Sequence, residues 1–275
     1  MTIKQTIYKT LKYPFFGRFM VKWRNPIPEP ERNEWKSVKV KSKSEGQIRG
    51  LLAFAKTASP KATIVLGHPM GKEAKGYFIK RGYTDMLREN GYNTLIFDIN
   101  GFGESSHGNF SCFEDIISVG LAAQKLIPEL PVGYFGISLG GHWATIAFAD
   151  ADHPYKFAIV ESAATTLDEF WVRFPFAHKS LQIFNVLLPK FKKRINMVER
   201  IKEAKNLQSL LLIYSQSDEW VALEMGERFK ANSPIATELW TVEKATHAEI
   251  SKSAYRDVYF EKIVAYFDGA VRYSV

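Results

Sequence analysis

Short apolar runs alternate with longer amphipathic stretches over most of the chain. The run at 62–66 (ATIVL) is continuously apolar, which is typical of a strand buried on both faces of a parallel sheet. Further strands are predicted at 93–98, 132–136, 157–160, 210–214 and 237–242. Helices are predicted at 77–90, 113–126, 139–150, 223–231 and 250–267. This alternation predicts an α/β fold with a mostly parallel sheet and helices on both of its faces.

A different pattern precedes these elements at 35–54. Valines at positions 38 and 40 alternate with lysines, which is the period of two expected of a half-buried strand. The sequence Ser-Glu-Gly at 44–46 is typical of a turn. We therefore expect two antiparallel strands here, which bring the predicted sheet to eight strands.

Residues 1–30 form a distinct leader. Ile3, Ile7 and Leu11 recur at helical spacing, with lysines on other faces. The aromatic residues of this segment are Tyr13, Phe15, Phe16, Phe19 and Trp23, and prolines at 26, 28 and 30 follow them. We expect a helix that packs on the main domain and shields the sheet edge. The alternative is a basic amphipathic segment, residues 1–24, in peripheral contact with a membrane surface.

The alternation of strands and helices pauses at 165–206. This stretch is too long for an ordinary loop and is rich in aromatic and aliphatic residues, so it predicts a helical cap insertion over the sheet. The core domain is then formed by 31–164 and 207–275. An aromatic roof favours an apolar substrate, and the residues expected to line the substrate pocket are Phe170, Trp171, Phe174 and Trp220. The leader is expected to lie near this insertion and to help present the substrate.

The strongest chemical signal is the sequence Gly-Ile-Ser-Leu-Gly-Gly at 136–141. It follows a predicted strand directly and opens a predicted helix, the context that the G-x-S-x-G nucleophile elbow requires. Glycines on either side let the strand and the helix approach closely. The sharp turn would lift the hydroxyl of Ser138 above the carboxyl ends of the strands.

Two partners for this serine follow predicted strands further along the chain. Asp218 comes just after the strand at 210–214, and His247 comes after the strand at 237–242. Taken singly, Asp218 fits a helix N-cap and His247 fits a surface loop. Glu161, at the end of another strand, is a rival acid.

The order serine, aspartate, histidine and the elbow resemble the α/β-hydrolase superfamily over about 62–267, with some likeness to its single-domain serine hydrolases that carry a helical cap. The resemblance implies that Ser138 is the nucleophile, His247 the general base and acid, and Asp218 the residue that orients the imidazole.

The resemblance also implies an oxyanion hole made of two backbone N–H groups. One belongs to Leu139, and the other is expected from Met70 in the loop after 62–66. Relatives usually have glycine after the loop histidine, whereas this chain has Pro69, which has no N–H to donate. His68 is expected to be a structural loop residue rather than a base.

Composition and charge narrow the class of protein. The 275 residues are 46% hydrophobic and 24% charged, which excludes a disordered chain. The 37 basic and 29 acidic residues give a net charge of +8, but no arginine-rich cluster stands out, so we expect no nucleic-acid partner. A single cysteine, Cys112, excludes an intrachain disulfide, and no zinc spacing occurs. We expect neither a metal nor a cofactor, and the oligomeric state stays open.

Location follows from two further patterns. No run of 18 apolar residues predicts a transmembrane helix, and lysines interrupt every candidate apolar core of a signal peptide in the N-terminal segment. We expect a cytoplasmic protein whose contact with a membrane, if the alternative for the leader holds, is peripheral.

The function predicted from these patterns is hydrolysis of an ester or thioester by a serine esterase, through an acyl-enzyme intermediate. The same triad also supports an amidase or peptidase, an acyltransferase or a carbon–carbon bond hydrolase. A non-catalytic binding protein with a hydrolase fold is a further alternative, and it predicts a damaged triad position.

Overall fold

The computed structural model describes residues 1–21, 27 and 29–273. Three leader positions that the sequence singled out, Trp23, Pro26 and Pro28, lie outside the described residues.

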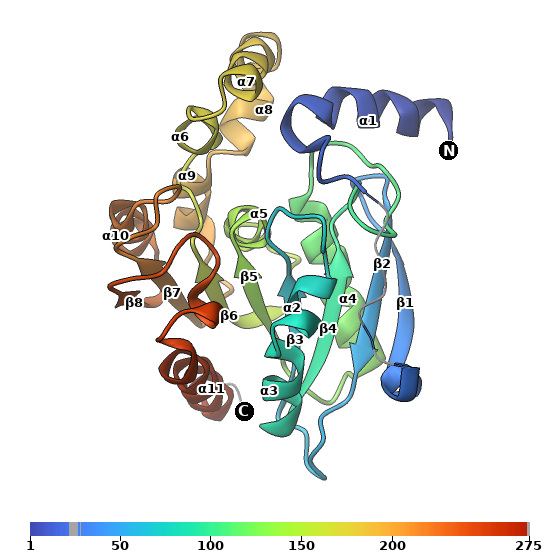
Figure 1. The fold of residues 1–275 in the computed structure, drawn as a ribbon, viewed down its shortest axis with the longest axis vertical. Helices are drawn as coiled ribbons and strands as arrows, with labels where there is room; N and C mark the ends of the chain where they lie inside the picture. The colour runs from blue at the N-terminus through green and yellow to red at the C-terminus, as the bar shows by residue number, and fades with distance from the viewer. Residues whose placement is uncertain (22–26, 28, 274–275) are drawn as a thin grey trace.

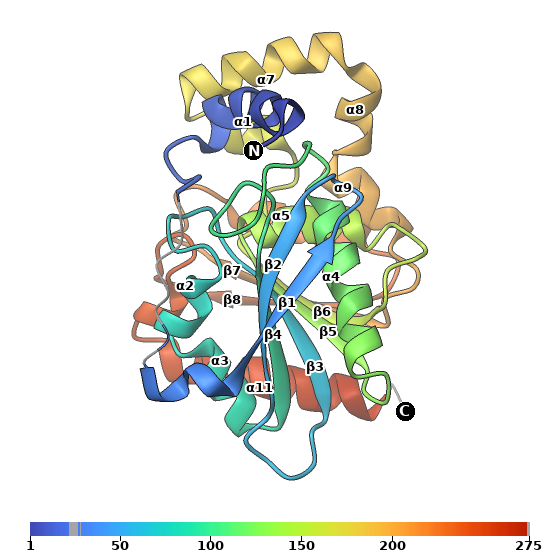
Figure 2. The ribbon, with the colours of Figure 1, turned by 90° about the vertical axis from the view of Figure 1, so that its right-hand side faces the viewer.

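An eight-stranded sheet forms the centre of the molecule, in the order β1-β2-β4-β3-β5-β6-β7-β8 (Figures 1 and 2). β1 pairs with β2, and β2 with β4, in antiparallel orientation, whereas the remaining neighbours are parallel. This confirms the predicted α/β fold. The strands are β1 (Trp35–Lys41), β2 (Gln47–Ala53), β3 (Ala62–Gly67), β4 (Tyr92–Asp98), β5 (Val132–Ile137), β6 (Tyr155–Glu161), β7 (Ser209–Ser215) and β8 (Ala236–Val242).

Helices cover both faces of the sheet and bury a separate hydrophobic cluster on each (Figure 1). One face carries α4 (Phe113–Leu126), α5 (Leu139–Ala147) and α10 (Leu223–Asn232). The other carries α2 (Gly76–Lys80), α3 (Tyr83–Glu89) and α11 (Arg256–Arg272). The central strands β3, β4 and β5 are buried along their whole length, which explains their continuous apolar sequences.

Two predicted helices differ from the structure. The helix predicted at 77–90 is divided, because Gly82 adopts a φ of 78° between α2 and α3, a conformation that favours glycine. The helix predicted at 250–267 begins as a short 3₁₀ helix (Ile250–Lys252), and α11 starts only at Arg256. A second short 3₁₀ helix (Glu29–Glu34) leads into β1.

The insertion predicted at 165–206 consists of short helices. These are α6 (Leu167–Trp171), α7 (Pro175–Leu187), α8 (Pro189–Arg194), α9 (Met197–Arg200) and a 3₁₀ turn (Ile201–Glu203). Proline occupies the first position of α7 and of α8, where its missing N–H costs no helical hydrogen bond. Helices α6 to α8 rise beyond the carboxyl end of the sheet (Figures 1 and 2).

Helix α1 (Ile3–Phe16) lies beside α7 at the same end of the molecule (Figures 1 and 2). It packs through Phe15 and Phe16, whose rings contact Trp171 at centroid distances of 5.5 and 5.9 Å. The same rings contact Phe110 and Phe102 of the core at 6.0 and 5.7 Å, so the helix packs on the main domain as expected. These contacts lie on the cap and on the loops that follow β4 rather than along the edge strand β1, so the expectation that the leader shields the sheet edge is wrong for this helix.

The apolar stripe of α1 does not face the protein. Ile3, Ile7 and Leu11 are 84%, 51% and 40% exposed, whereas Lys12 is buried. The Lys12 ammonium donates to the side-chain carbonyl of Asn100, which lies directly after β4. Because Lys12 binds a polar partner far along the chain, α1 buries the face that carries Lys12 and exposes its apolar stripe.

Candidate active site

Ser138 occupies a sharp turn between β5 and α5. Its φ of 47° and ψ of −110° lie in a region that non-glycine residues rarely adopt. Its N–H donates to the Glu161 carbonyl oxygen at 2.8 Å, which fixes the turn against the next strand. A Cβ at Gly140 would collide with the Gly67 carbonyl, so only glycine permits this approach of helix to strand.

The structure brings Ser138, His247 and Asp218 together. The Ser138 hydroxyl donates to Nε2 of His247 at 2.7 Å. On the other side of the ring, Nδ1 donates to the two carboxylate oxygens of Asp218 at 2.8 and 3.1 Å. The three residues follow the carboxyl ends of β5, β8 and β7, so the parallel strands deliver them to one edge of the sheet.

Asp218 is held as a carboxylate. Burial alone would raise its pKa, but the hydrogen bond from His247 and those from the backbone N–H groups of Trp220 and Val221 lower the pKa overall. The alternative that Asp218 caps a helix is wrong, because the N-cap of α10 is Ala222. The position of Asp218 therefore suits it to orient an imidazole and to stabilise its cation.

Glu161, the rival acid, lies at the end of β6 and is completely buried. One oxygen accepts the Tyr259 hydroxyl, and the other, Oε1, has no hydrogen-bond partner among the described residues. Burial raises the pKa of Glu161 to about 8. This carboxyl is therefore mainly neutral at pH 7, and the acid in contact with the imidazole is Asp218.

The two expected oxyanion donors lie beside the serine. Leu139 is the first residue of α5, so its N–H has no partner within the helix. Met70, Leu139 and Ser138 line one gap of about 10 Å³, close to the smallest volume that holds a water molecule. Pro69 leaves this arrangement intact because the expected donor is the following residue.

His68 has the structural role expected of it. Its ring is buried, with Nδ1 donating to the Pro69 carbonyl at 2.8 Å and Nε2 accepting the N–H of Ile99 at 3.1 Å. Burial lowers the pKa of His68, which fits a neutral ring that both donates and accepts. Its backbone carbonyl accepts the N–H of Gly140 at 3.1 Å and so ties this loop to the elbow helix.

An open cleft of about 370 Å³ lies on the His247 side of the serine. Phe170 and Trp220 line it as predicted, and the Trp220 ring stacks on the imidazole at 5.3 Å. The charged residues that also line it are Lys72, Glu73, Arg81, Glu219 and Glu249.

Two predicted pocket residues lie elsewhere. Trp171 does not line the cleft but lines the gap at Ser138 and a separate apolar cavity. Phe174 is also absent from the cleft lining; it packs against the rings of Trp171 and Trp220 at 5.6 and 5.5 Å. For Trp171 the single turn of α6 explains this, because neighbouring residues on a helix face different directions. Phe174 lies beyond α6, at the N-cap of α7.

Two further residues lie near the site. The Tyr77 hydroxyl donates to the Ala248 carbonyl at 2.5 Å and fixes the loop that carries His247. His142 is buried beside Ser138, and burial lowers its pKa to about 3, so the ring is neutral. No sequence signal marks Tyr77, because its partner lies in a loop more than half the chain away.

Across the part of the chain that the structure describes, no group of three or more His, Cys, Asp or Glu side chains could hold a metal ion. Among the described helices, none combines the length and the hydropathy needed to cross a bilayer.

Solved structures of other proteins share this architecture. The esterase Pf2001 of Pyrococcus furiosus is 20% identical, with a TM-score of 0.68 over 89% of this chain and 93% of the esterase. The acylaminoacyl peptidase of Pyrococcus horikoshii is 16% identical, with a TM-score of 0.63 over 86% of this chain and 41% of the peptidase. A predicted CIB-like hydrolase of Thermoplasma acidophilum is 15% identical, with a TM-score of 0.59 over 84% of this chain and 97% of that one.

Sequence identities this low show that the proteins share a fold, but they do not show a shared activity or substrate. No curated protein sequence matches the chain. The model of the serine aminopeptidase family S33, in contrast, matches residues 58–217, more than half of the chain, and this stretch contains the elbow with Ser138. The chain therefore belongs to the serine aminopeptidase S33 family, and it is an enzyme of the α/β-hydrolase superfamily.

Proposed function

We propose that this enzyme hydrolyses an ester or thioester with an apolar acyl group, and that Ser138 forms the acyl-enzyme intermediate. The observation that carries the proposal is the continuous chain of hydrogen bonds from Ser138 through His247 to Asp218. The family supports a hydrolase, and the apolar surroundings of the serine favour the acyl group.

In the first half of the reaction, the Ser138 oxygen attacks the carbonyl carbon of the substrate while Nε2 of His247 accepts the hydroxyl proton. The carbonyl oxygen becomes an oxyanion, to which we assign the N–H groups of Leu139 and Met70 as hydrogen-bond donors. When the intermediate collapses, the bond to the alcohol or thiol breaks and His247 returns its proton to that group.

In the second half, water enters from the open cleft. His247 takes one proton of the water, the hydroxide attacks the acyl carbon, and collapse of the second intermediate releases the carboxylic acid. The proton returns to the Ser138 oxygen. Asp218 stays a carboxylate throughout, consistent with its lowered pKa, and stabilises the imidazolium that forms in each half.

Amide or peptide cleavage is the second candidate, and the name of the matching family favours it. The two candidates are separated by comparing the ester and the anilide of one acyl group. An acyltransferase would show faster product formation when an alcohol is added as acceptor. A carbon–carbon bond hydrolase would cleave neither substrate. A non-catalytic binding protein is disfavoured because all three triad side chains are present and in contact.

The decisive experiment is hydrolysis of p-nitrophenyl esters with Ser138→Ala as the control variant. We expect measurable turnover that the substitution lowers at least a thousandfold while the fold is retained. If Ser138→Ala hydrolyses the esters as well as the unchanged enzyme does, the proposal is wrong.

A further inference from the structure

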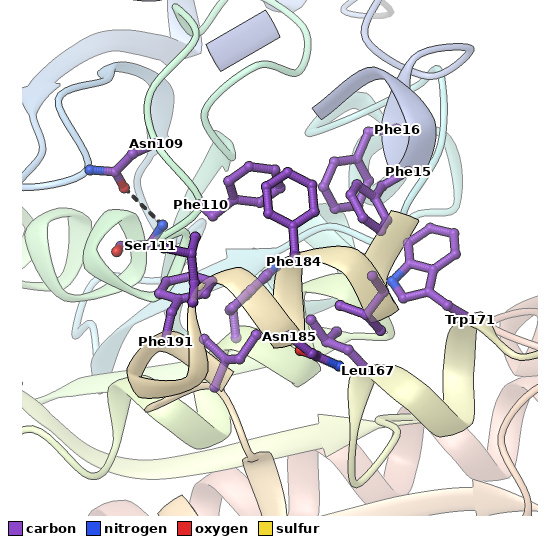
Figure 3. Close-up of a pocket in the computed structure, with 14 residues that line it drawn as sticks. Phe15, Phe16, Asn109, Phe110, Ser111, Leu167, Trp171, Phe184, Asn185 and Phe191 are labelled. Atoms are coloured by element: carbon purple, nitrogen blue, oxygen red, sulfur yellow. Dashed lines mark hydrogen bonds between the residues drawn. The ribbon is translucent and has the colours of Figure 1, made fainter. Parts of the chain in front are cut away.

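A second cavity lies between the cap, α1 and the core, away from the cleft that His247 lines. Its volume is about 290 Å³ (Figure 3). Phe15 and Phe16 of α1 reach into it from one side, and Phe184 of α7 and Trp171 of α6 from another. Helix α1 thus supplies one wall of the cavity.

The lining of this cavity is almost entirely apolar and includes no ionisable side chain. Among the polar residues of the lining, the Asn109 oxygen accepts the N–H of Ser111 at 2.8 Å, and the Asn185 amide lies 3.3 Å from a carboxylate oxygen of Asp168. These two groups are therefore already engaged with the protein, whereas the indole N–H of Trp143, also in the lining, has no hydrogen-bond partner among the described residues. A cavity of this chemistry excludes charged ligands and favours a hydrocarbon chain.

The cavity reaches towards the nucleophile. Phe16, Trp143, Leu167 and Trp171 line both this cavity and the gap beside Ser138. The gap itself is only about 10 Å³, so a chain can pass from the serine to the cavity only when a side chain such as Trp171 shifts.

The position of His247 decides which half of an ester lies on which side. The leaving group must receive its proton from His247, and His247 lines the open cleft with its charged residues. The acyl half then points to the opposite side of Ser138, where the gap leads to the apolar cavity.

We propose, on the basis of the function proposed above, that this cavity binds the acyl chain of a medium-chain ester or thioester whose polar leaving group occupies the open cleft. An apolar cavity of about 150 Å³ holds one benzene molecule. The 290 Å³ of the present cavity then accommodates roughly ten to twelve carbon atoms.

The test is a series of p-nitrophenyl esters from acetate to palmitate, assayed with two tryptophan variants of α7. Leu181 lines the cavity, whereas Ile183 is exposed on the same helix. We expect kcat/KM to peak at ten to twelve carbons. Leu181→Trp should lower it at least tenfold for the decanoate and change the acetate less than twofold, while Ile183→Trp changes neither.

Several results would overturn this assignment. One is a preference for acetate in the unchanged enzyme, and another is an equal loss at every chain length in Leu181→Trp. Faster hydrolysis of decyl acetate than of ethyl decanoate would place the alcohol in the cavity instead. Each of these leaves the triad intact, whereas full activity of Ser138→Ala would refute the proposed function itself. Unfolding of Leu181→Trp is detected by circular dichroism, and Asn185→Phe, also in the lining, then serves as the blocking variant.

A second inference rests on how charge is distributed. The segments 1–21 and 172–194 contain ten of the 37 basic residues and none of the 29 acidic ones. The rest of the chain has 27 basic and 29 acidic residues, so the entire positive net charge comes from these two segments. They form α1, α7 and α8, which share one end of the molecule (Figures 1 and 2).

The same helices expose large apolar side chains. The exposed residues of this kind are Ile3, Ile7, Leu11 and Tyr13 on α1, and Phe176, Ile183, Val186 and Leu187 on α7. Of the ten basic residues, Lys12 is buried, and Lys4 and Arg194 form ion pairs with Glu45 and Glu114. Apolar side chains beside the remaining positive charge are the combination that binds an anionic lipid surface, where each nearby cation contributes about 1 kcal/mol.

We infer that this face, defined by α1, α7 and α8, docks on an anionic lipid surface. The cavity for the acyl chain lies directly beneath it, between α1 and α7. A fatty acyl substrate would then enter from the lipid without crossing water.

Sedimentation with phosphatidylglycerol vesicles tests this docking. We expect binding that weakens at high salt, and Val186→Ser with Leu187→Ser should weaken it at least fivefold without changing acetate hydrolysis. Val258→Ser, at an exposed position of α11 outside this face, is the matched control and should bind normally. Absence of binding, or equal loss in the control, would refute the docking. So would a dimer in solution that the double variant dissociates, because the face would then be covered by a second copy.

Discussion

Replacing Asp218 by asparagine should damage turnover far more than replacing Glu161 by glutamine. Asp218 lies 2.8 Å from Nδ1 of His247. At an effective dielectric constant of about 20, a carboxylate at this distance stabilises an imidazolium by about 6 kcal/mol. Asparagine loses that interaction, and its amide favours the ring tautomer that cannot accept the proton of Ser138.

The expected loss in kcat is a thousandfold to ten-thousandfold for Asp218→Asn, since each tenfold corresponds to about 1.4 kcal/mol. Glu161→Gln should cost less than tenfold, because Glu161 is already mainly neutral at pH 7 and accepts a hydrogen bond from Tyr259 rather than from the imidazole. Glutamine is likewise neutral, and its side chain has nearly the same size as that of glutamate.

The assay is the steady-state kcat of each variant on the best p-nitrophenyl ester, with circular dichroism to show that both variants fold. A greater loss in folded Glu161→Gln than in folded Asp218→Asn would refute the assignment of the acid. Equal and small losses would show that neither carboxyl supports the histidine.

Three further outcomes are expected. A fluorophosphonate probe should label Ser138, and recovery of the adduct on another serine by peptide mass spectrometry would contradict the elbow assignment. Gly140→Ala should lower the unfolding free energy by roughly 1–3 kcal/mol and impair turnover, because the new methyl group collides with the Gly67 carbonyl; urea denaturation measures this. Burial raises the pKa of Glu161 from 4.5 to about 8, so the folded state retains a proton that the unfolded state has lost. Stability should therefore fall between about pH 4.5 and 8, by up to 1.4 kcal/mol per pH unit, and Glu161→Gln should remove this contribution; an unchanged pH profile in thermal melts would contradict it.

The sheet was predictable from the sequence because its signals are local. Strands β3 to β7 are buried on both faces, and the apolar runs in their sequences indicate this burial directly. The elbow was equally accessible, since the glycines around Ser138 are required by a turn only a few residues long. Asp218 and His247 were predicted because they follow Ser138 in the order that the superfamily shows, serine, aspartate and histidine.

The parts that depend on distant contacts were not predictable. The apolar stripe of α1 indicated a buried face, yet the buried side chains include Lys12, whose partner Asn100 lies in another element. The sequence also did not predict that the open cleft and the apolar cavity are separate spaces. Phe170 and Trp171 are adjacent in sequence, but only Phe170 lines the cleft.

The packing of helix α1 on residues far along the chain has a consequence for synthesis on the ribosome. Its rings pack on Phe110, Trp171 and Phe184, and Trp171 is synthesised roughly 150 residues after Phe16. At about 5–20 residues per second, this interval lasts roughly eight to thirty seconds. During that time α1 has no cap to rest on, and its phenylalanines are open to chaperones. Chains stalled before Trp171 should therefore be held by such factors, and the apolar cavity cannot close before its last lining residue, Ile195, has been synthesised.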